Sequence, residues 1–406
     1  MRETPIGWYL FDLLFASMKK KKKGYKVVIF FFTLLIYTTF HMTRKPISVV
    51  KSVLHENCTD KAAKEHKIVT PDNNTFCDWK PFDKDNWSEL LGNLDLAYLL
   101  AYAVSMFCSG HIAERVNIRY FLTIGMFLCG LSTSLFGLGF YLQIHNYYYY
   151  LFVQDSSIST LDYESVNRET QPILSKKLEI QSNISFLQAL LIPGVIEYSL
   201  CLFFAKLVSY TFLFWLPTLI KNTGTLDSKD SANLSAIMDA GGILGGIIAG
   251  IINDLTGASA LTCSGMLVIA VPYLYVYYLY GSTQMAATII LLLFLGILVN
   301  GPYALITTAV SADLGTHDTL MGNARAIATV TAIIDGTGSL GAALGPLLTG
   351  LLLTRYGWKS IFIMLMIATA LAAILLTRRV FKEIVIIHKQ RKEKLTERIC
   401  QEKEYA

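Results

Sequence analysis

Charged residues are scarce in this sequence. Asp, Glu, Lys and Arg make up 16% of its 406 residues, whereas an ordinary soluble domain contains about 25%. Residues 27–43, 120–154 and 255–312 contain none at all. A helix of roughly 20 apolar residues spans a bilayer core, and a buried helix of a soluble protein needs only about 12. These blocks exclude a large soluble helical protein and predict an all-α protein that crosses a membrane several times.

The chain also lacks the residue patterns of enzymes and metal proteins. Its seven cysteines are scattered, without the spacing of a metal site, and no pair of nucleophile and base stands out. We therefore expect no enzymatic activity, no metal and no cofactor. Cys58 and Cys77 share one polar loop, where an oxidising lumen would allow a disulfide.

The N-terminus is basic. The five consecutive lysines Lys19–Lys23 precede the first apolar block, and because basic flanks favour the cytosol, residues 1–24 are expected there. Nucleic-acid binding is the rival interpretation of such a run, and we expect no nucleic-acid partner, because the run adjoins a membrane span. No small-residue cleavage site follows the first block closely, so we expect it to stay as an anchor. The loop 48–89 would then be lumenal, and its sequons predict glycans on Asn57 and Asn73.

The apolar blocks define two unequal halves. Residues 25–154 contain three spans and then Tyr147–Gln154, which starts like a fourth span and ends after eight residues. At 1.5 Å per residue this stretch covers about 12 Å of a core of about 30 Å. Residues 155–190 form a linker of mixed charge, residues 191–380 supply six more spans, and residues 381–406 form a basic tail.

The number of spans conflicts with the charge of the C-terminal region. Three spans carry the chain from the cytosol to the lumen. Because six is an even number, the six later spans bring the chain back to the lumenal side, where the tail should then lie. Basic residues, which favour the cytosol, are nevertheless concentrated after the last span: Arg378, Arg379, Lys382, Lys389, Arg391, Lys392 and Lys394. The count therefore predicts that one span inserts wrongly and that the chain does not transport.

A short pattern recurs in the two halves. Gly110 stands four residues before Glu114 after the second span, and Gly250 stands four residues before Asp254 after the second span of the six-helix group. Many transporters are built from such repeats. We expect a gating motif that holds helix ends together rather than contacting substrate. Its members are Gly110, Glu114, Arg115, Arg119, Gly250 and Asp254.

Five longer blocks are specific enough to compare with known families. They are His41–Lys51, Trp79–Asn86, Phe204–Pro217, Asn300–His317 and Asp335–Pro346. They resemble the sugar-phosphate exchangers of solute carrier family 37, in the major facilitator superfamily. The resemblance covers about residues 25–154 and 192–382. It implies a twelve-span fold from which most of the fourth span and the whole fifth and sixth spans are missing, so that about three N-terminal and six C-terminal spans remain.

The same resemblance implies a function. It indicates an antiporter that exchanges a sugar phosphate, glucose 6-phosphate, for inorganic phosphate by alternating access. It also implies a multi-pass protein of the endoplasmic reticulum membrane, with the lipid bilayer as its surroundings. The alternative is a membrane protein that does not transport, inert or regulatory, because half of its N-terminal bundle is absent.

Cationic residues in the first span of each half are the candidates for binding a phosphoryl group. Arg44 and Lys45 end the first span, where the resemblance implies a phosphate clamp; a snorkelling pair that anchors the helix is the alternative. Lys206 lies inside the first span of the second half. It shares a helical face with Ser209 and Tyr210, which follow three and four residues later.

The second half also contains an embedded aspartate and a series of regularly spaced glycines. Asp335 is embedded in a span and is expected to line the cavity or to pair with a cation, with a structural contact between helices as the alternative. Gly242, Gly246 and Gly250 have a spacing of four residues, which favours close packing of helices over contact with a ligand.

Overall fold

A computed structural model describes most of the chain. The described residues are 31–32, 34–35, 38–39, 45–55, 78–113, 118–156, 186–223, 228–281, 284–315 and 324–404. The chain divides into two compact units, Met1–Pro46 and Ile47–Ala406. The architecture below is that of the second unit.

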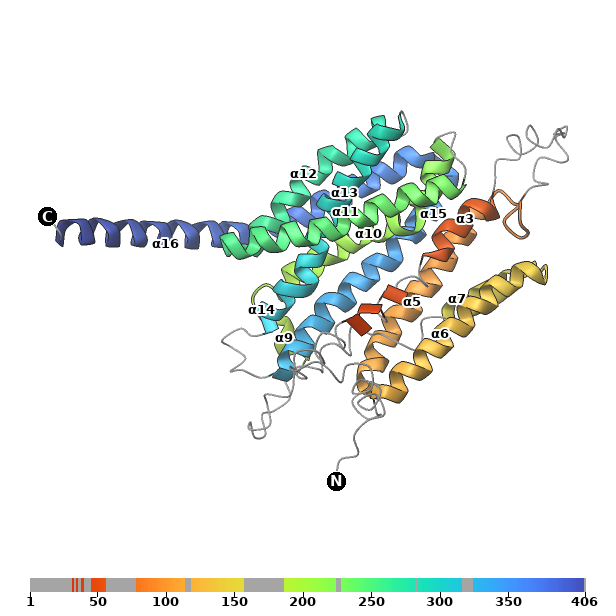
Figure 1. The fold of residues 1–406 in the computed structure, drawn as a ribbon, viewed down its shortest axis with the longest axis horizontal. Helices are drawn as coiled ribbons and strands as arrows, with labels where there is room; N and C mark the ends of the chain where they lie inside the picture. Colours follow the sequence, from red (N-terminus) through yellow and green to blue (C-terminus); the bar gives the residue numbers. More distant parts are fainter. Residues whose placement is uncertain are drawn as a thin grey trace, which may run out of the picture. The chain divides into compact units, whose positions relative to one another are not determined.

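The described residues form helices and no strands (Figure 1). The first half contains α3 (Pro46–Leu54), α5 (Trp87–Ala113), α6 (Ile118–Tyr141) and α7 (Tyr147–Ser156). The second half contains α9 (Phe186–Leu190), α10 (Val195–Thr223), α11 (Ser228–Thr256), α12 (Ser259–Tyr280), α13 (Met285–Leu305), the π-helical turn η2 (Ile306–Val310), α14 (Ser311–Gly315), α15 (Ala324–Leu375) and α16 (Thr377–Glu404). Within the described ranges, six helices are long and apolar enough to cross a membrane. The expected all-α membrane fold is confirmed.

Helix α15 contains two of the expected spans. Its 52 residues are broken at Gly357, where φ is 68° and ψ is −173°. Residues with a Cβ rarely adopt a positive φ, so a glycine at this position lets the chain reverse between the two spans. The sequence-based spans 326–353 and 360–377 correspond to the two parts of α15.

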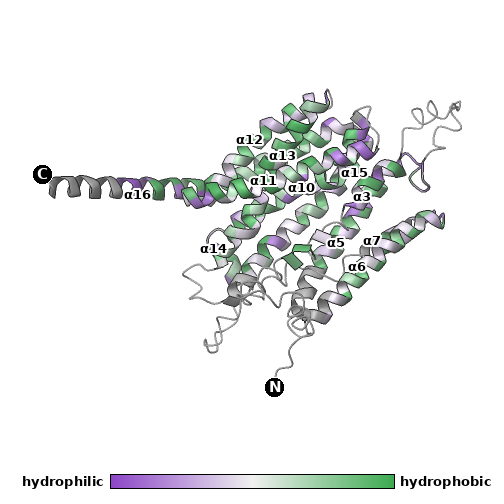
Figure 2. Ribbon diagram, viewed as in Figure 1, coloured by the Kyte–Doolittle hydropathy of each residue, from purple (hydrophilic) through white to green (hydrophobic). Residues whose placement is uncertain are grey.

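Helix α10 is the central helix of this unit. In the apolar part of α10 that is long enough to cross a membrane, 78% of the residues are buried, against 28% in the corresponding part of α11. Its side chains enter three separate hydrophobic clusters, represented by Leu202, Phe212 and Trp215. Helix α11 instead exposes a stripe of isoleucines, including Ile243 and Ile247, and Figure 2 shows that the bundle helices consist largely of hydrophobic residues. Lipid would cover this stripe in a membrane.

Helices α11 and α13 cross at glycines. A Cβ on Gly245 would lie 2.5 Å from the carbonyl oxygen of Ile297, whereas a Cβ on Gly250 would meet nothing within 4 Å. The expected close packing is therefore present, but at a different register. Gly242 and Gly246 contact side chains of α13, the tightest contacts to the α13 backbone include Gly245, and Gly250 lies outside the crossing.

We expect Gly245→Ala to destabilise the protein and Gly250→Ala, in the same helix, to leave it unchanged or slightly more stable. Forcing a methyl group into a packed contact costs about 1–3 kcal/mol. An open helical glycine replaced by alanine gains up to about 1 kcal/mol. Thermal unfolding of the two purified variants measures the difference. Equal unfolding temperatures would contradict the observed register of this crossing.

One end of the unit, which we call the Trp87 end, is where α5 begins. There the hydroxyl of Ser88 donates a hydrogen bond of 2.7 Å to the carbonyl oxygen of Gly350 in α15. The rings of Trp87 and Trp215 are 6.4 Å apart, and Trp215 lies in the second half of α10. Helix α5 therefore runs antiparallel to α10 and to the first part of α15.

The opposite end, which we call the Val195 end, is where α10 begins and where α16 follows α15. Glu197 of α10 and Arg379 of α16 form an ion pair of 3.9 Å there. The carboxylate of Glu383 accepts two hydrogen bonds, each of 2.9 Å, from backbone N–H groups at the start of α12. The basic tail therefore starts at the Val195 end, whereas the segment before α5 lies at the Trp87 end.

The structure differs here from the expectation that the tail emerges on the same side as the loop 48–89, and the side of the membrane on which the tail lies stays a prediction. Helix α7 begins at the Trp87 end, where the Tyr147 hydroxyl donates a 3.2 Å hydrogen bond to the carbonyl oxygen of Leu90. Helix α9 directly precedes Val195 at the other end. The chain thus passes from one end to the other between Tyr147 and Phe186. Helix α7 covers about 15 Å of that path with its 10 residues.

Glycosylation of the loop before α5 tests which end of the protein faces the lumen. The Trp87 end is predicted to be lumenal, because the lysine run favours a cytosolic N-terminus. Asn57 and Asn73 lie outside the described residues, and their glycosylation remains a prediction. Removal of N-glycans should increase the electrophoretic mobility of the wild type but not of an Asn57→Gln/Asn73→Gln variant. Unchanged mobility of the wild type, in cells that glycosylate a control protein, would argue against a lumenal loop.

Candidate functional site

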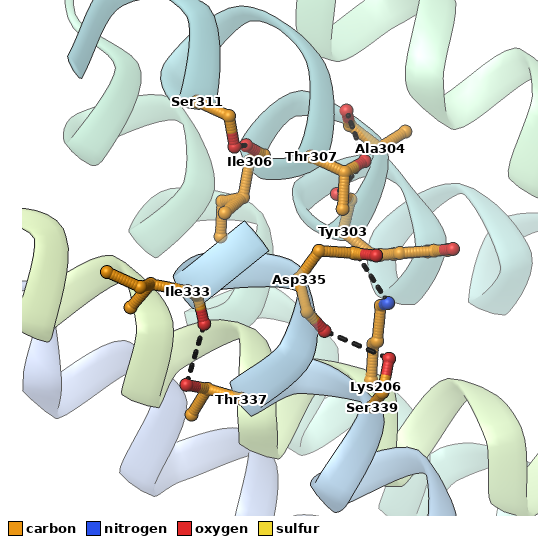
Figure 3. Close-up of polar contacts among 10 residues, drawn as sticks. All are labelled: Lys206, Tyr303, Ala304, Ile306, Thr307, Ser311, Ile333, Asp335, Thr337 and Ser339. Carbon is orange, nitrogen blue, oxygen red and sulfur yellow. Dashed lines mark hydrogen bonds and ion pairs between the residues drawn. The ribbon is translucent and has the colours of Figure 1, made fainter. Parts of the chain in front are cut away.

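A buried ion pair lies at the contact between α10 and α15. The ammonium nitrogen of Lys206 is 2.6 Å from a carboxylate oxygen of Asp335, and the two side chains are 1% and 3% exposed. Figure 3 shows the lysine extending from α10 toward the aspartate on α15. Buried charges in a membrane protein are costly unless they are paired. Charged residues inside membrane spans are rare, and they usually mark functional sites.

The surroundings of this pair make room for the lysine and orient it. A Cβ on Gly338 would lie 3.0 Å from Cδ of Lys206, so the small residue makes space for the aliphatic part of the lysine. The ammonium lies 5.4 Å from the centre of the Tyr303 ring, a cation–π distance. One turn after Asp335, the hydroxyl of Ser339 donates a 2.9 Å hydrogen bond to the carbonyl oxygen of Asp335.

The third wall of the site comes from a distorted part of the α13 helix. After Tyr303, the π-helical turn η2 interrupts the α-helix, a deformation that occurs often at functional sites. Its polar groups are bonded locally: the hydroxyl of Thr307 donates to the carbonyl oxygen of Tyr303 at 3.0 Å, and that of Ser311 to Ile306 at 2.8 Å. Figure 3 shows these residues above the ion pair.

The structure brings together two residues that the sequence singled out separately. Asp335 pairs with a cation, which was one of its expected roles, and the cation is Lys206. Ser209 is buried, and its hydroxyl has no hydrogen-bond partner among the described residues. Tyr210 packs in another cluster, 6.3 Å from the ring of Phe214. The binding role expected of Lys206, Ser209 and Tyr210 stays a prediction.

Several of the other predicted site residues lie outside the part of the chain that the structure describes. Arg44, Glu114 and Arg115 lie outside the described residues, as do Asn57, Asn73, Cys58 and Cys77. Lys45 is half-buried and belongs to the first unit. Gly110 lies in α5, Arg119 in α6, and Gly250 and Asp254 in α11. The gating motif therefore stays a prediction.

A second buried ion pair was missed by the sequence reasoning. Lys51 of α3 contacts the carboxylate of Asp95 in α5, and both side chains are fully buried. The lysine was assigned to the polar loop because the first span was expected to end at Arg44. The structure instead has a short helix, Pro46–Leu54, in that position. An isolated aspartate inside the second span was the signal that could have indicated this pair.

Comparison with known proteins adds to this picture. The family model of the Major Facilitator Superfamily matches residues 198–399. Glucose-6-phosphate exchanger SLC37A2 from Danio rerio is 44% identical, over 93% of this chain and 93% of its own length. SLC37A2 from Homo sapiens is 40% identical, over 87% and 91%. Glucose-6-phosphate exchanger SLC37A1 from Homo sapiens is also 40% identical, over 87% and 92%.

The length of these alignments shows an interruption. The alignment with the Danio rerio relative has 479 positions, whereas 93% of 406 residues is about 378, so about 100 positions hold no residue of this chain. The matched part is nevertheless similar over nearly the whole length of both proteins. The chain therefore belongs to solute carrier family 37 of the major facilitator superfamily.

Proposed function

We propose that this chain is a sugar-phosphate transporter that exchanges glucose 6-phosphate for inorganic phosphate by alternating access. Two observations support the proposal. The relatives are glucose-6-phosphate exchangers by name, and the second half contains a buried lysine, Lys206, that forms an ion pair with Asp335. A phosphoryl group entering the bundle needs a fixed cation of this kind.

The ion pair suggests how the substrate binds. Without substrate, Asp335 compensates the charge of Lys206, which would otherwise be costly to bury. A phosphoryl group carries nearly two negative charges and three acceptor oxygens, so it can displace a carboxylate with one charge. Sugar phosphate and inorganic phosphate share this group. One cation can therefore serve both substrates in turn, and Arg44 is proposed as the second cation.

The proposed location is a membrane of the endoplasmic reticulum type, with the Trp87 end on the lumenal side. The support is the family resemblance and the charge of the two termini, since basic flanks favour the cytosol. Immunofluorescence with a lumenal marker of that membrane tests the location. Staining confined to the plasma membrane would contradict it.

A second candidate function is that of a membrane protein that does not transport. The specific observation in its favour is the group of about 100 alignment positions without residues in this chain. Helix α7, with 10 residues, is also too short to cross a bilayer by itself. In this case the Lys206–Asp335 pair would only hold α10 against α15.

Counter-transport separates the two candidates. The purified chain is placed in proteoliposomes loaded with inorganic phosphate, and labelled glucose 6-phosphate is supplied outside. We expect uptake that depends on internal phosphate. Uptake equal to that of protein-free liposomes, with the chain correctly inserted, would favour the non-transporting alternative.

A further inference from the structure

We propose that the Lys51–Asp95 pair is the charged element of a gate at the Trp87 end, so that breaking the pair opens the substrate site from that side. The proposal rests on the proposed transport function for its purpose. Its structural basis is independent of that function. Lys51 and Asp95 are then positioning residues, which control access to Lys206 without contacting the substrate.

Lys51 connects the two halves of the protein. Lys51 and Asp95 belong to the first-half helices α3 and α5, and both are fully buried. The ammonium of Lys51 also faces two rings of the second-half helix α10: Trp215, with its ring centre 4.5 Å away, and Phe214 at 5.4 Å. One cation thus holds a carboxylate on one side of the boundary and aromatic faces on the other.

A second layer of contacts lies closer to the Trp87 end. The Ser88 hydroxyl of α5 is 2.7 Å from the carbonyl oxygen of Gly350 and 2.9 Å from the hydroxyl of Thr354, both in α15. One turn further along α5, Gly92 allows the two backbones to touch, because a Cβ there would lie 3.2 Å from Cα of Gly350. From Ser88 to Asp95 the closed stretch of α5 is roughly 10 Å long.

A third contact joins the halves at the same end. The ammonium of Lys221, in the last turn of α10, donates to the carbonyl oxygen of Ser52 in α3. The neighbouring His55 stacks on Trp87, with ring centroids 4.1 Å apart, which connects α3 to the start of α5. Three layers of side chains therefore close the boundary between the halves at the Trp87 end.

The contacts at this boundary comprise one ion pair, cation–π contacts, hydrogen bonds and a glycine crossing, and they lie beside an apolar cluster that includes Leu94, Phe214 and Ala343. The charged pair is buried among these apolar side chains, so its loss is expected to weaken the closure. At the Val195 end, the ion pair Glu197–Arg379 and the Glu383 hydrogen bonds join only second-half helices among the described residues. The structure therefore corresponds to a state that is closed at the Trp87 end.

The test measures access directly. Ala343, 2% exposed in the cluster that contains Phe214 and Trp215, is replaced by cysteine in a background without the native cysteines. A membrane-impermeant maleimide is applied on the side that the loop 48–89 faces. Lys51→Met, Asp95→Asn and the double variant Lys51→Met/Asp95→Asn should each raise the labelling rate at least about 10-fold, the factor that corresponds to 1.4 kcal/mol. Lys51→Arg, which keeps a cation facing both the carboxylate and the rings, should leave the rate near the starting value.

Two controls keep the result interpretable. An Ala372→Cys reporter, fully buried in the cluster near the Val195 end, should show no change in any variant, and general unfolding would label both reporters. The double variant leaves no single buried charge, so its labelling reports the gate rather than a destabilised fold.

Unchanged labelling in the folded variants would overturn the proposal. So would a Lys51→Arg variant that labels as fast as Lys51→Met, because the cation would then not hold the boundary closed. Labelling is measured without transport. If no variant and no wild type exchanges substrate, the proposed function fails while the gate is still tested.

Discussion

Replacing Lys206 by alanine should abolish phosphate-driven uptake of glucose 6-phosphate. The substitution removes the cation that we propose to bind the phosphoryl group, and it breaks the buried ion pair with Asp335. Truncating one member of a buried, hydrogen-bonded charge pair costs about 2–5 kcal/mol. This corresponds to a loss of at least about 30-fold in exchange rate. Counter-transport in proteoliposomes measures the loss.

Controls separate binding from stability. Lys206→Met/Asp335→Asn removes both charges together, so we expect it to insert and fold normally and still to fail in exchange. Lys359→Ala, at an exposed lysine of α15, should have no effect on uptake. Normal exchange by the double variant would remove the pair from the substrate site.

Arg44→Ala should have an effect of similar size, and Arg44→Lys should also impair exchange, because lysine cannot form the two parallel hydrogen bonds of a guanidinium with a phosphoryl group. The same uptake measurement tests these variants. Wild-type uptake by Arg44→Ala would show that Arg44 is not the second cation.

The second large effect is the orientation of the tail. We expect an epitope after residue 406 to be digested by protease added to sealed microsomes, and an epitope inserted between residues 56 and 77 to be protected until detergent is added. The reason is that α16 starts at the Val195 end, held by Glu383 and Arg379, whereas the loop before α5 lies at the Trp87 end. Basic flanks then favour the cytosol for the tail.

Each epitope should be either fully digested or fully protected, because it lies on one side of the membrane or the other. A protected tail would mean that the chain emerges as the simple count of spans predicts, with three spans before the linker. The packing of α5 against α10 and α15 would then not exist in the membrane. An epitope at the N-terminus, beside the lysine run, serves as the cytosolic reference.

Sequence reasoning located the second-half spans well, because hydropathy is a local property and each span is long. It also selected Lys206 and Asp335, since charges inside apolar spans stand out. It did not determine that they pair, because they are 129 positions apart and only the packing of α10 on α15 brings them together.

The differences between expectation and structure depend on packing, which hydropathy does not show. Lys51 was assigned to a loop because the residues around it look polar, and only its burial against Asp95 and Trp215 shows otherwise. The side on which the tail emerges was inferred by counting spans and stays to be tested, while the structure places the start of α16 and the start of α5 at opposite ends. Gly242 and Gly246 of α11 face α13 as expected and Gly250 does not, since spacing alone does not show where the crossing ends.

Uptake of labelled glucose 6-phosphate into phosphate-loaded proteoliposomes tests the central claim most directly. The samples are this 406-residue chain and its Lys206→Met/Asp335→Asn variant, reconstituted at equal density and with equal inserted fractions. We expect uptake by the wild type that disappears when internal phosphate is omitted, and no uptake by the variant. Wild-type uptake no greater than that of protein-free liposomes, or equal uptake by the two proteins, would contradict it.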